Sequence, residues 1–559
     1  MRSKISIAVS AAIAAAACGA AASANAASLV ADASHFFPTS GSTAMNNPIN
    51  EYFLLTNGIC NGSTTDATQI NVYTDGSFST TAPGSFGGFH QMLFVCKART
   101  ALGTVPAGDV IAIAKEGNGG SLEGTISVAR SQTLAFLDPL NPAGVTCSNT
   151  PAGSGAQNVS GAINAHEQAF TVHTGCSTLN QYAPVIGWAD ELPQVWQGFG
   201  ARPITGSDIT ALTTTPLVQN VFGIAVSENL YRALQNMQGK TVKDDSLAQM
   251  PSLSASTIAG LYTGFVPSWS NIVNAAGTTL VASNPAGTHA PNSGTVFLCR
   301  RGDSSGTNAS VDLNFIGNRC NANGIAQAAP NTTNAHCGGL PAGGTPVDFG
   351  CSWNTTNNLA DTVFAGAGGG DVAACLDQHN ANNDWAIGNL TTNQGFKDAN
   401  GAGGSTGDTA AGTNVHFRFV AIDGHLPNLT SVANGHYTYV EDNVLNVRAH
   451  PSGANPTGQA ALFTFITSAT TGFNNPAILL DIDGLQTSGK TLGGVQDPDW
   501  NQGLLFDAFN SPNTAGAPPV TSTQLIGAGG TATSQLTQIL GQSMNNCQPP
   551  IPSSGVVNP

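Results

Sequence analysis

Short apolar runs alternate along this chain with stretches of helical character, a pattern typical of an α/β protein. The apolar runs predict buried strands at residues 110–114, 184–189, 221–226, 295–299 and 417–422. Helices are predicted at residues 227–238, 254–262 and 308–316. Ser254 is a suitable N-cap for the second of these helices. The sequence shows no internal repeat, so we expect one α/β arrangement rather than a repeat array.

Three parts of the chain lack this alternation. Residues 274–294 are rich in Ala, Gly, Asn and Pro, and residues 321–382 are rich in Gly, Asn, Ala and Thr. We interpret both as insertions, the second one cysteine-rich. From residue 511 onward the chain is rich in Pro, Gly and Thr, and residues 548–559 are expected to form a loose tail.

The first 26 residues have the features of a secretory signal. Arg2 and Lys4 give the positively charged start, and residues 5–22 are apolar and alanine-rich. Ala24-Asn25-Ala26 then offers a cleavage site between small residues. This pattern predicts an exported protein.

A lipoprotein interpretation, with Cys18 as the modified residue, competes with simple export. The three alanines before Cys18 lack the branched residue that such a site usually has, so simple export is favoured. No later segment contains the ~20 consecutive apolar residues of a membrane-spanning helix. We therefore expect a periplasmic or secreted, extracellular protein without a membrane-spanning segment after the signal is removed.

The charge balance narrows the range of partners. The chain has 17 basic and 32 acidic residues, a formal net charge of −15. A surface of this sign argues against nucleic acid or an anionic membrane as the partner. It does not exclude a small anion, because a buried site responds to local dipoles and side chains rather than to the global charge.

Removal of the signal segment leaves ten cysteines, an even number that favours disulfides in an exported chain. No pair has the C-x-x-C spacing of zinc ribbons, thioredoxin-like redox sites or c-type haem attachment. Pairing between sequence neighbours would join Cys60 to Cys96 and Cys147 to Cys176, but the sequence leaves the connectivity open. Four cysteines between residues 320 and 375 would brace the predicted insertion.

The most informative stretch is Arg301-Gly302-Asp303-Ser304-Ser305-Gly306-Thr307, which precedes a predicted helix. Small and hydroxyl-bearing residues at a helix N-terminus present N–H groups and hydroxyls to an anion, where aligned peptide dipoles add about half a positive charge. Arg301 contributes a planar fork of donors for an oxyanion, and Asp303 is close enough in sequence to brace it. An ordinary N-cap turn and an Arg-Gly-Asp adhesion motif are the competing interpretations.

Further polar turns follow predicted strands elsewhere in the chain. Gly41-Ser42-Thr43 lies near the mature N-terminus, Gly119-Gly120-Ser121 follows the strand at 110–114, and Asp190 follows the strand at 184–189. In an open α/β sheet, ligands bind at the carboxyl ends of the strands. We therefore expect the hydroxyl, carboxylate and guanidinium groups of these turns and of the arginine motif to converge on one polar site.

Together these motifs resemble the type II periplasmic solute-binding proteins and, within that class, the phosphate-binding proteins of ABC transporters. The resemblance spans most of residues 35–450 in the same order. The matching stretches are Arg301-x-Asp303-x-Ser305-Gly306-Thr307, Gly41-Ser42-Thr43, Ala189-Asp190-Glu191-Leu192-Pro193, Tyr262-Thr263-Gly264, Trp269-Ser270-Asn271, Trp385-Ala386-Ile387-Gly388 and Ile422-Asp423-Gly424. The resemblance implies an α/β fold of two lobes, with discontinuous domains and a ligand cleft between them.

The resemblance also implies individual roles. The residues that would contact phosphate or a similar protonated oxyanion are Thr43, Ser121, Asp190, Arg301, Ser305, Gly306 and Thr307. Asp190 would accept a hydrogen bond from a protonated ligand and repel fully ionised sulfate, while Asp303 would orient Arg301 without touching the ligand. This chain departs from the family at Ala44, where an aromatic residue is usual, and its turn at Ser121 is only loosely similar.

The expected organisation follows from the same resemblance. The divisions are a signal at 1–26, a first lobe at 27–222 that returns at 416–547, a second lobe at 223–415 and the tail at 548–559. Phosphate would lie in the cleft, with Thr43, Ser121 and Asp190 on one wall and the arginine motif on the other. The expected partners are the oxyanion and an ABC permease, with no cofactor.

Two other functions compete with phosphate capture for uptake or scavenging. A secreted phosphatase would need catalytic groups, but the sequence has no H-E-x-x-H, no G-x-S-x-G and no dense His/Asp cluster, so neither an enzyme nor a metal site is predicted. A surface or structural protein that keeps the fold without a ligand would fit the Asn/Thr/Gly-rich insertions and the low charge. Oxyanion affinity separates this last class from the binding protein.

Overall fold

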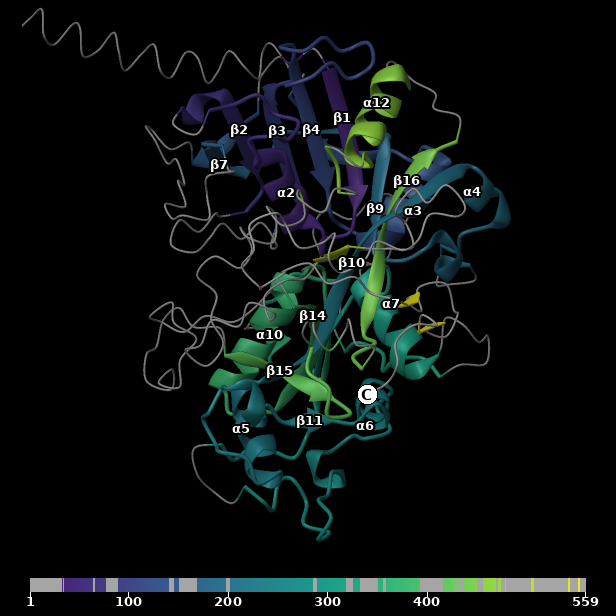
Figure 1. The fold of residues 1–559 in the computed structure, drawn as a ribbon. Coiled ribbons are helices and arrows are strands. Elements are labelled where there is room, and N and C mark those ends of the chain that lie inside the picture. The colour runs from purple at the N-terminus through teal and green to yellow at the C-terminus, as the bar shows by residue number, and fades with distance from the viewer. Residues whose placement is uncertain are drawn as a thin grey trace, which may run out of the picture.

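The computed structural model of this chain is a mixed α/β molecule (Figure 1). It describes residues 33, 35–63, 66–76, 89–139, 145–149, 168–197, 202–284, 289–317, 325–331, 350–354, 358–392, 416–427, 431, 436–449, 456–468, 471–473, 478, 504–506, 541–542 and 551–552. The predicted signal segment lies outside these residues. Of the predicted tail only Ile551–Pro552 is described, paired with Gly541–Gln542. Within the described part of the chain, no helix has both the length and the apolar character needed to cross a membrane.

The described strands are β1 His35–Gly41, β2 Ile70–Thr74, β3 Gln91–Lys97, β4 Val110–Glu116, β5 Leu134–Leu137, β6 Cys147–Asn149, β7 Thr171–Cys176, β8 Leu179–Tyr182, β9 Ile186–Ala189, β10 Leu212–Ser227, β11 Ser252–Leu253, β12 Phe297–Arg301, β13 Val363–Gly366, β14 Ala386–Thr391, β15 Phe417–Ile422, β16 Val440–Arg448, β17 Leu504–Phe506, β18 Gly541–Gln542 and β19 Ile551–Pro552. The described α-helices are α2 Asn46–Leu54, α3 Gly120–Arg130, α4 Gly206–Thr210, α5 Glu228–Met237, α6 Ala255–Tyr262, α7 Gly306–Val311, α10 Gly369–Ala381 and α12 Pro456–Ile466. Helix α7 continues as the π-helical turn Asp312–Ile316.

The strands and helices predicted from the apolar pattern are confirmed. The predicted strands fall in β4, β9, β10, β12 and β15, and the predicted helices are α5, α6 and α7 with its π-helical continuation. The largest difference is the length of β10, which has 16 residues and begins at Leu212. Its first half is rich in threonine, a β-branched residue that favours strands but does not register as an apolar run.

Fifteen of the described strands form one large mixed sheet. Its main path runs β13-β12-β14-β10-β16-β9-β1-β4-β3-β2-β7-β6. The first part of β10 pairs with β16, and its last part pairs with β14 and β15, so β10 extends across the middle of the molecule (Figure 1). The register with β16 shifts between Pro216 and Val218, where the proline has no N–H to give to the ladder.

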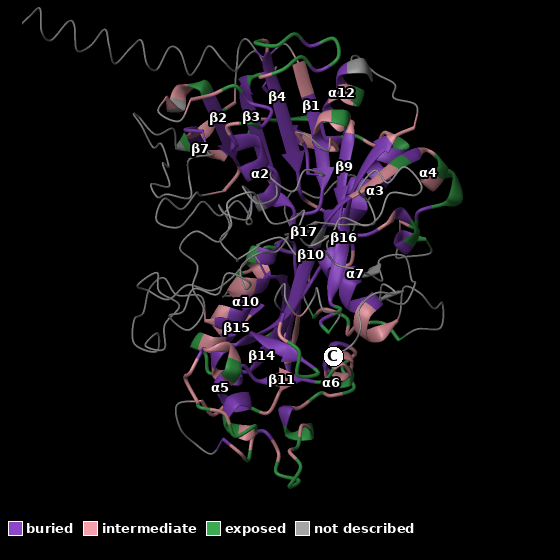
Figure 2. Ribbon diagram, in the orientation of Figure 1, coloured by how far each residue is buried: buried purple, intermediate pink, exposed green. Residues whose placement is uncertain are grey.

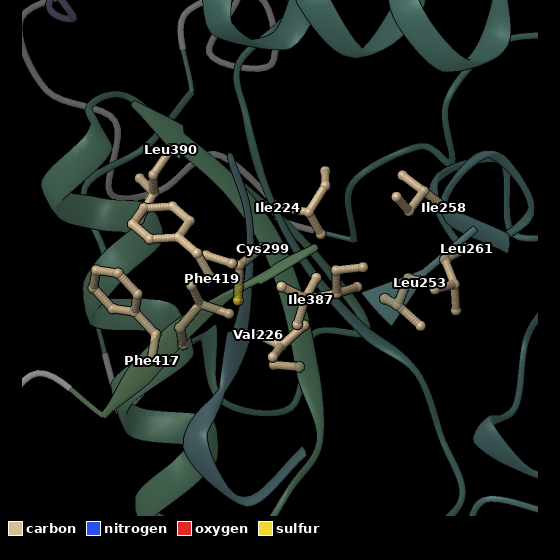
Figure 3. Close-up of a cluster of buried hydrophobic side chains, with 14 of the residues drawn as sticks. Ile224, Val226, Leu253, Ile258, Leu261, Cys299, Ile387, Leu390, Phe417 and Phe419 are labelled. Carbon is tan, nitrogen blue, oxygen red and sulfur yellow. The ribbon is translucent and has the colours of Figure 1, made fainter. Parts of the chain in front are cut away.

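The two largest hydrophobic clusters among the described residues lie along this sheet, and we call them the first and the second core. The first is built around β1, β3, β4, α2 and α12 and contains Phe37, Phe94 and Leu462. The second is built around β12, β14, β15, α5, α6 and α10, and Figure 3 shows part of it, including Ile224 and Phe419. The strands of both cores are buried, and the exposed residues lie on the outer helices and turns (Figure 2). The arrangement as two lobes around a ligand cleft stays a prediction.

Packing differs from the expected domain divisions in two places. Strand β15 and the residues Tyr437 and Tyr439 belong to the second core, so the chain rejoins the first core within β16, at residues 444–447, rather than at residue 416. Residues 363–381 lie in the predicted insertion but form β13 and α10, with Phe364 and Leu376 buried in the second core. The glycines between β13 and α10 form a short turn from strand to helix. From composition alone, this glycine-rich stretch is indistinguishable from a loop.

Three disulfides join described cysteines. The pairs Cys60–Cys96 and Cys147–Cys176 are present, which confirms the pairing of sequence neighbours. The third pair, Cys299–Cys375, links β12 to α10. Cys375 therefore braces the second core and not the loop region around residue 320.

Helix α3 packs on the sheet through direct backbone contact. A Cβ atom placed on Gly124 would lie 2.0 Å from the carbonyl oxygen of Trp188 in β9, and one placed on Gly187 would lie 1.7 Å from the carbonyl oxygen of Gly124. Gly41, at the end of β1, meets the same Trp188 oxygen at 2.0 Å. Only glycine allows this approach, which brings the N-terminus of α3 to the ends of β1 and β9.

We predict that Gly124→Ala destabilises the protein. Alanine gains ~0.5–1 kcal/mol in helix propensity, but relieving the clash with Trp188 requires backbone movement that costs ~1–3 kcal/mol. The free energy of unfolding, measured by urea denaturation, should therefore fall. Gly206→Ala at the start of α4 is the matched control, because nothing lies within 4 Å of its added Cβ. Equal stability of the Gly124 variant and the parent would contradict this account of the packing.

Candidate functional site

Four strand ends hold most of the residues that the sequence predicted to form a site. Strands β1, β4 and β9 are parallel, with β1 in the middle, so their carboxyl ends meet at one edge of the sheet. The turn after β1 carries Ser42 and Thr43, the helix after β4 carries Ser121 in its first turn, and Asp190 directly follows β9. Arg301 ends β12, a few residues before α7.

The carboxylate of Asp190 is the centre of this group. Ser42 donates its hydroxyl to Oδ1 at 2.5 Å, and Ser121 donates its hydroxyl to Oδ2 at 3.0 Å. Ser121 Oγ in turn accepts the backbone N–H of Asp190 at 3.0 Å. All three residues are buried, with Asp190 only 1% exposed. The three chain segments after β1, β4 and β9 are thus tied to a single carboxylate.

Opposing effects act on the pKa of Asp190. Burial raises it, because the charged form loses water. The hydrogen bonds from Ser42 and Ser121 lower it, as do the positive charges of Arg301 and Lys115. The net shift of the pKa is upward. A further hydrogen-bond donor or positive charge near Asp190 would stabilise the charged form of this buried carboxylate.

The start of α7 lies directly against this carboxylate. A Cβ atom placed on Gly306 would lie 2.4 Å from Ser121 Oγ and 2.6 Å from both Cβ and Oδ2 of Asp190. The backbone N–H of Leu122 donates to the carbonyl oxygen of Ser304 at 3.0 Å. The segment after β12 therefore contacts the segments after β4 and β9, and Gly306 is the residue that permits the contact.

Arg301 is buried beside the same cluster and is held by backbone carbonyls. Its Nε donates to the carbonyl oxygen of Gly366 at 3.2 Å and its Nη2 to that of Ala367 at 2.7 Å. Burial lowers its pKa to about 10, while Asp371 and Asp190 raise it. The remaining nitrogen, Nη1, has no hydrogen-bond partner among the described residues.

Asp303 pairs with a different arginine from the one that the resemblance implied. Asp303 instead accepts a hydrogen bond from Nη1 of Arg300 at 2.6 Å. Arg300 and Arg301 are consecutive residues of β12, so their side chains leave opposite faces of the strand. Arg301 reaches the carbonyls at the end of β13, and Arg300 is the arginine that turns back to Asp303.

The hydroxyl-bearing residues of the predicted site are buried. Thr43, Ser305 and Thr307 are each 3–4% exposed. Their side-chain hydroxyls make no hydrogen bond to any described residue, which is uncommon for buried polar groups. The carbonyl oxygen of Thr307 accepts from Asn389 at 2.6 Å, which fixes the first turn of α7 in place. These hydroxyls are therefore available to an acceptor.

The sequence reasoning missed two residues of this network. Ser42 belongs to the predicted turn, but the resemblance implies a ligand contact only for Thr43. Lys115, at 2% exposure, donates to the carbonyl oxygens of Gly41 and Ser42 at 3.2 and 2.9 Å and to Asn46 Oδ1 at 2.6 Å. Burial lowers the pKa of Lys115 to about 7, although the negative charges of Glu116 and Asp190 act to raise it. A lysine at the end of an otherwise apolar strand was the available signal.

This arrangement suits a small oxyanion that carries a proton. Arg301, the free hydroxyls and the first N–H groups of α7 are donors, and Asp190 is an acceptor. A metal ion has no comparable set of ligands here. Among the described residues the convergent ligand group is Cys299, Cys375 and His379, which lies in the second core. Its two sulfur atoms form a disulfide.

Comparisons with known proteins give distant structural likenesses. No protein-family model matches the sequence, and no curated protein matches it. Among solved structures, a phosphate ABC transporter substrate-binding protein with bound phosphate from Clostridium perfringens is similar over 80% of this chain and 98% of its own, with 11% identity and a TM-score of 0.33. An ABC-type phosphate transport receptor from Vibrio cholerae gives 54% and 79% coverage, 13% identity and a TM-score of 0.27. PstS from Borrelia burgdorferi is similar over 54% of this chain and 78% of its own, with 10% identity and a TM-score of 0.25.

Replacement of Lys115 by methionine should change how stability depends on pH. The pKa of Lys115 is about 7 in the folded protein and has an ordinary value of 10.5, so between these values the unfolded chain binds more protons. The contribution of Lys115 to the free energy of unfolding therefore rises with pH across that window. The unfolding free energy of the parent minus that of Lys115→Met should increase from pH 7 to pH 10, and a flat difference would contradict the burial effect. Lys97→Met, at an exposed position of β3, is the control.

Proposed function

We propose that this chain is an exported solute-binding protein that captures phosphate, or a similar protonated oxyanion, at the site around Asp190 and Arg301. One observation carries the proposal. The buried Asp190 carboxylate, bonded to Ser42 and Ser121, lies against the start of α7 at Gly306 and is electrostatically coupled to the buried Arg301. Few functions need an anion, a cation and unpaired hydroxyls buried together.

The chemistry of the proposed ligand matches the groups present. Phosphate at neutral pH has oxygens that accept hydrogen bonds and at least one proton to donate. Arg301 Nη1, the hydroxyls of Thr43, Ser305 and Thr307 and the N–H groups at the start of α7 would bind the oxygens, including the N–H of Gly306. The Asp190 carboxylate would accept a hydrogen bond from the protonated oxygen of the ligand. Ser121 would reach the ligand by turning its hydroxyl from Asp190 to the anion.

Ligand capture of this kind would involve a two-lobed structure that closes over the anion. The two cores would form two lobes, connected by the long strands β10 and β16, and closure over the anion would be a hinge motion in which both walls engage the ligand. The protein would act in the periplasm or outside the cell, for scavenging or for delivery to an ABC permease. The motif chemistry supports ligand binding without catalysis.

A second candidate is a secreted surface protein that keeps this fold without a ligand. The observation that favours it is the direct contact of Gly306 with Asp190 and Ser121, because the protein's own carboxylate then occupies the start of α7. In that case the hydroxyls of Ser42 and Ser121 serve only Asp190. Phosphate affinity decides between the two candidates.

Arg301→Ala should lower phosphate affinity at least about 30-fold, because truncating one partner of a buried charged hydrogen bond costs ~2–5 kcal/mol. The measurement is calorimetric titration of oxidised protein that has been unfolded and refolded to remove bound anions. Asp303→Asn is the matched control: since Asp303 pairs with Arg300, its loss should leave the affinity within about threefold. Full phosphate affinity in a folded Arg301→Ala variant would show that the site is wrongly assigned. No heat from the folded parent would favour the surface protein.

Asp190→Asn should weaken the discrimination between phosphate and sulfate. An ionised carboxylate repels an anion that has no proton to donate, whereas an amide of the same shape can donate to it. We expect the ratio of phosphate to sulfate affinity to fall at least about tenfold, equivalent to ~1.4 kcal/mol. Asp208→Asn, at a buried aspartate that pairs with Arg130, is the control. An unchanged ratio in the Asp190 variant would exclude this role.

A further inference from the structure

A hollow lined by aromatic side chains lies in the part of the molecule that contains the second core. It is bordered by the start of α6, the π-helical turn after α7, the turn after β15 and the residues that lead into β16. Figure 1 shows α6 and β15 in the half of the molecule below the middle of β10. The hollow has an empty volume of about 390 Å³, including solvent at its mouth. None of the residues assigned to the oxyanion site lines it.

Three rings form its inner wall. Tyr437 and Tyr439 are each 2% exposed, and Phe315 meets Tyr439 edge-on, with ring centroids 4.9 Å apart. The hydroxyl of Tyr437 donates to the carbonyl oxygen of Phe222 at 2.6 Å. The hydroxyl of Tyr439 bonds with Ser310 at 2.9 Å and accepts from Asn389 at 3.0 Å. Both phenol oxygens are therefore used within the protein, and the ring orientations are fixed before any ligand arrives.

The rim adds two imidazoles and a carboxylate. The exposed rings of His425 and His436 are stacked, with centroids 5.1 Å apart and planes inclined by 26°. Asp423 is exposed at the same rim, and its Oδ1 accepts the backbone N–H of Ala255 at 3.2 Å. Its second oxygen has no partner among the described residues. The lining contains no lysine or arginine.

This combination favours a small organic cation over the other ligand classes. Aromatic faces attract a cation through the ring quadrupole, with ~0.5–2 kcal/mol per interaction, and aromatic cages with a nearby carboxylate suit alkylated ammonium groups. An anion would meet the carboxylate of Asp423 and no lysine or arginine. A bare metal ion would need convergent ligand atoms, and the described group of that kind lies at Cys299, Cys375 and His379 instead. The net charge of −15 also favours the approach of cations.

We propose that this hollow binds a small quaternary ammonium ion, with the alkyl groups against Phe315, Tyr437 and Tyr439 and the charge facing Asp423. The hollow shares no lining residue with the proposed oxyanion site. It requires no covalent step and no cofactor. The stacked imidazoles of His425 and His436 would close the outer side of the cage.

Calorimetric titration of the full-length oxidised protein with choline chloride tests this proposal. The control ligand is 3,3-dimethylbutan-1-ol, the uncharged carbon isostere of choline. We expect choline to bind at least about tenfold more tightly than the isostere, a difference that cation–π attraction and one carboxylate can supply. Asp423→Asn and Phe315→Leu should each weaken choline binding at least about threefold, and Arg301→Ala should leave it unchanged.

Three results would overturn the proposal. The first is no choline binding by the folded parent, and the second is equal affinity for choline and the isostere, which would indicate an unselective apolar hollow. The third is choline binding that neither variant alters, which would place the cation elsewhere. Asp423 and Phe315 lie at the rim and in a half-buried wall, so circular dichroism of both variants should match the parent. The outcome does not depend on phosphate binding, because Arg301→Ala separates the two sites.

Discussion

The contact on which the rest of the site depends is the buried carboxylate of Asp190 between the hydroxyls of Ser42 and Ser121. Burial of a carboxylate is costly unless its oxygens are hydrogen-bonded. Here the donors come from the ends of β1 and β4, so satisfying one charge fixes three chain segments. Lys115 fixes the segment after β1 by donating hydrogen bonds to the carbonyl oxygens of Gly41 and Ser42.

Glycine makes this convergence sterically feasible. Gly124 and Gly187 let α3 approach β9 through backbone atoms, which delivers Ser121 to Asp190. Gly306 lets the start of α7 reach the same carboxylate from the side of the second core. The polar site therefore depends on the glycine packing. A side chain at any of these three positions would separate Asp190 from Ser121 or from the start of α7, which the candidate function needs together. The aromatic hollow stands apart from this constraint, since it is built on fixed tyrosines near the start of β16.

Much of this architecture could be predicted from sequence. The apolar runs predict β4, β9, β12 and β15. Because parallel strands end at the same edge of a sheet, the polar turns after the strands also predict that Ser121 and Asp190 lie close together. What the pattern could not give was the direction of side chains. The neighbouring arginines of β12 leave opposite faces, so Asp303 pairs with Arg300 rather than Arg301. Composition also misled at β13 and α10, where glycine marks a turn between buried elements and not an insertion.

A crystal structure of the refolded protein grown with phosphate tests the central claim most directly. We expect one tetrahedral anion within hydrogen-bonding distance of Arg301 Nη1 and of at least one hydroxyl among Thr43, Ser305 and Thr307. One of its oxygens should face the carboxylate of Asp190. An anion bound elsewhere would contradict the account, as would a site in which Ser42, Ser121 and Gly306 remain closed on Asp190 with no anion at saturating phosphate.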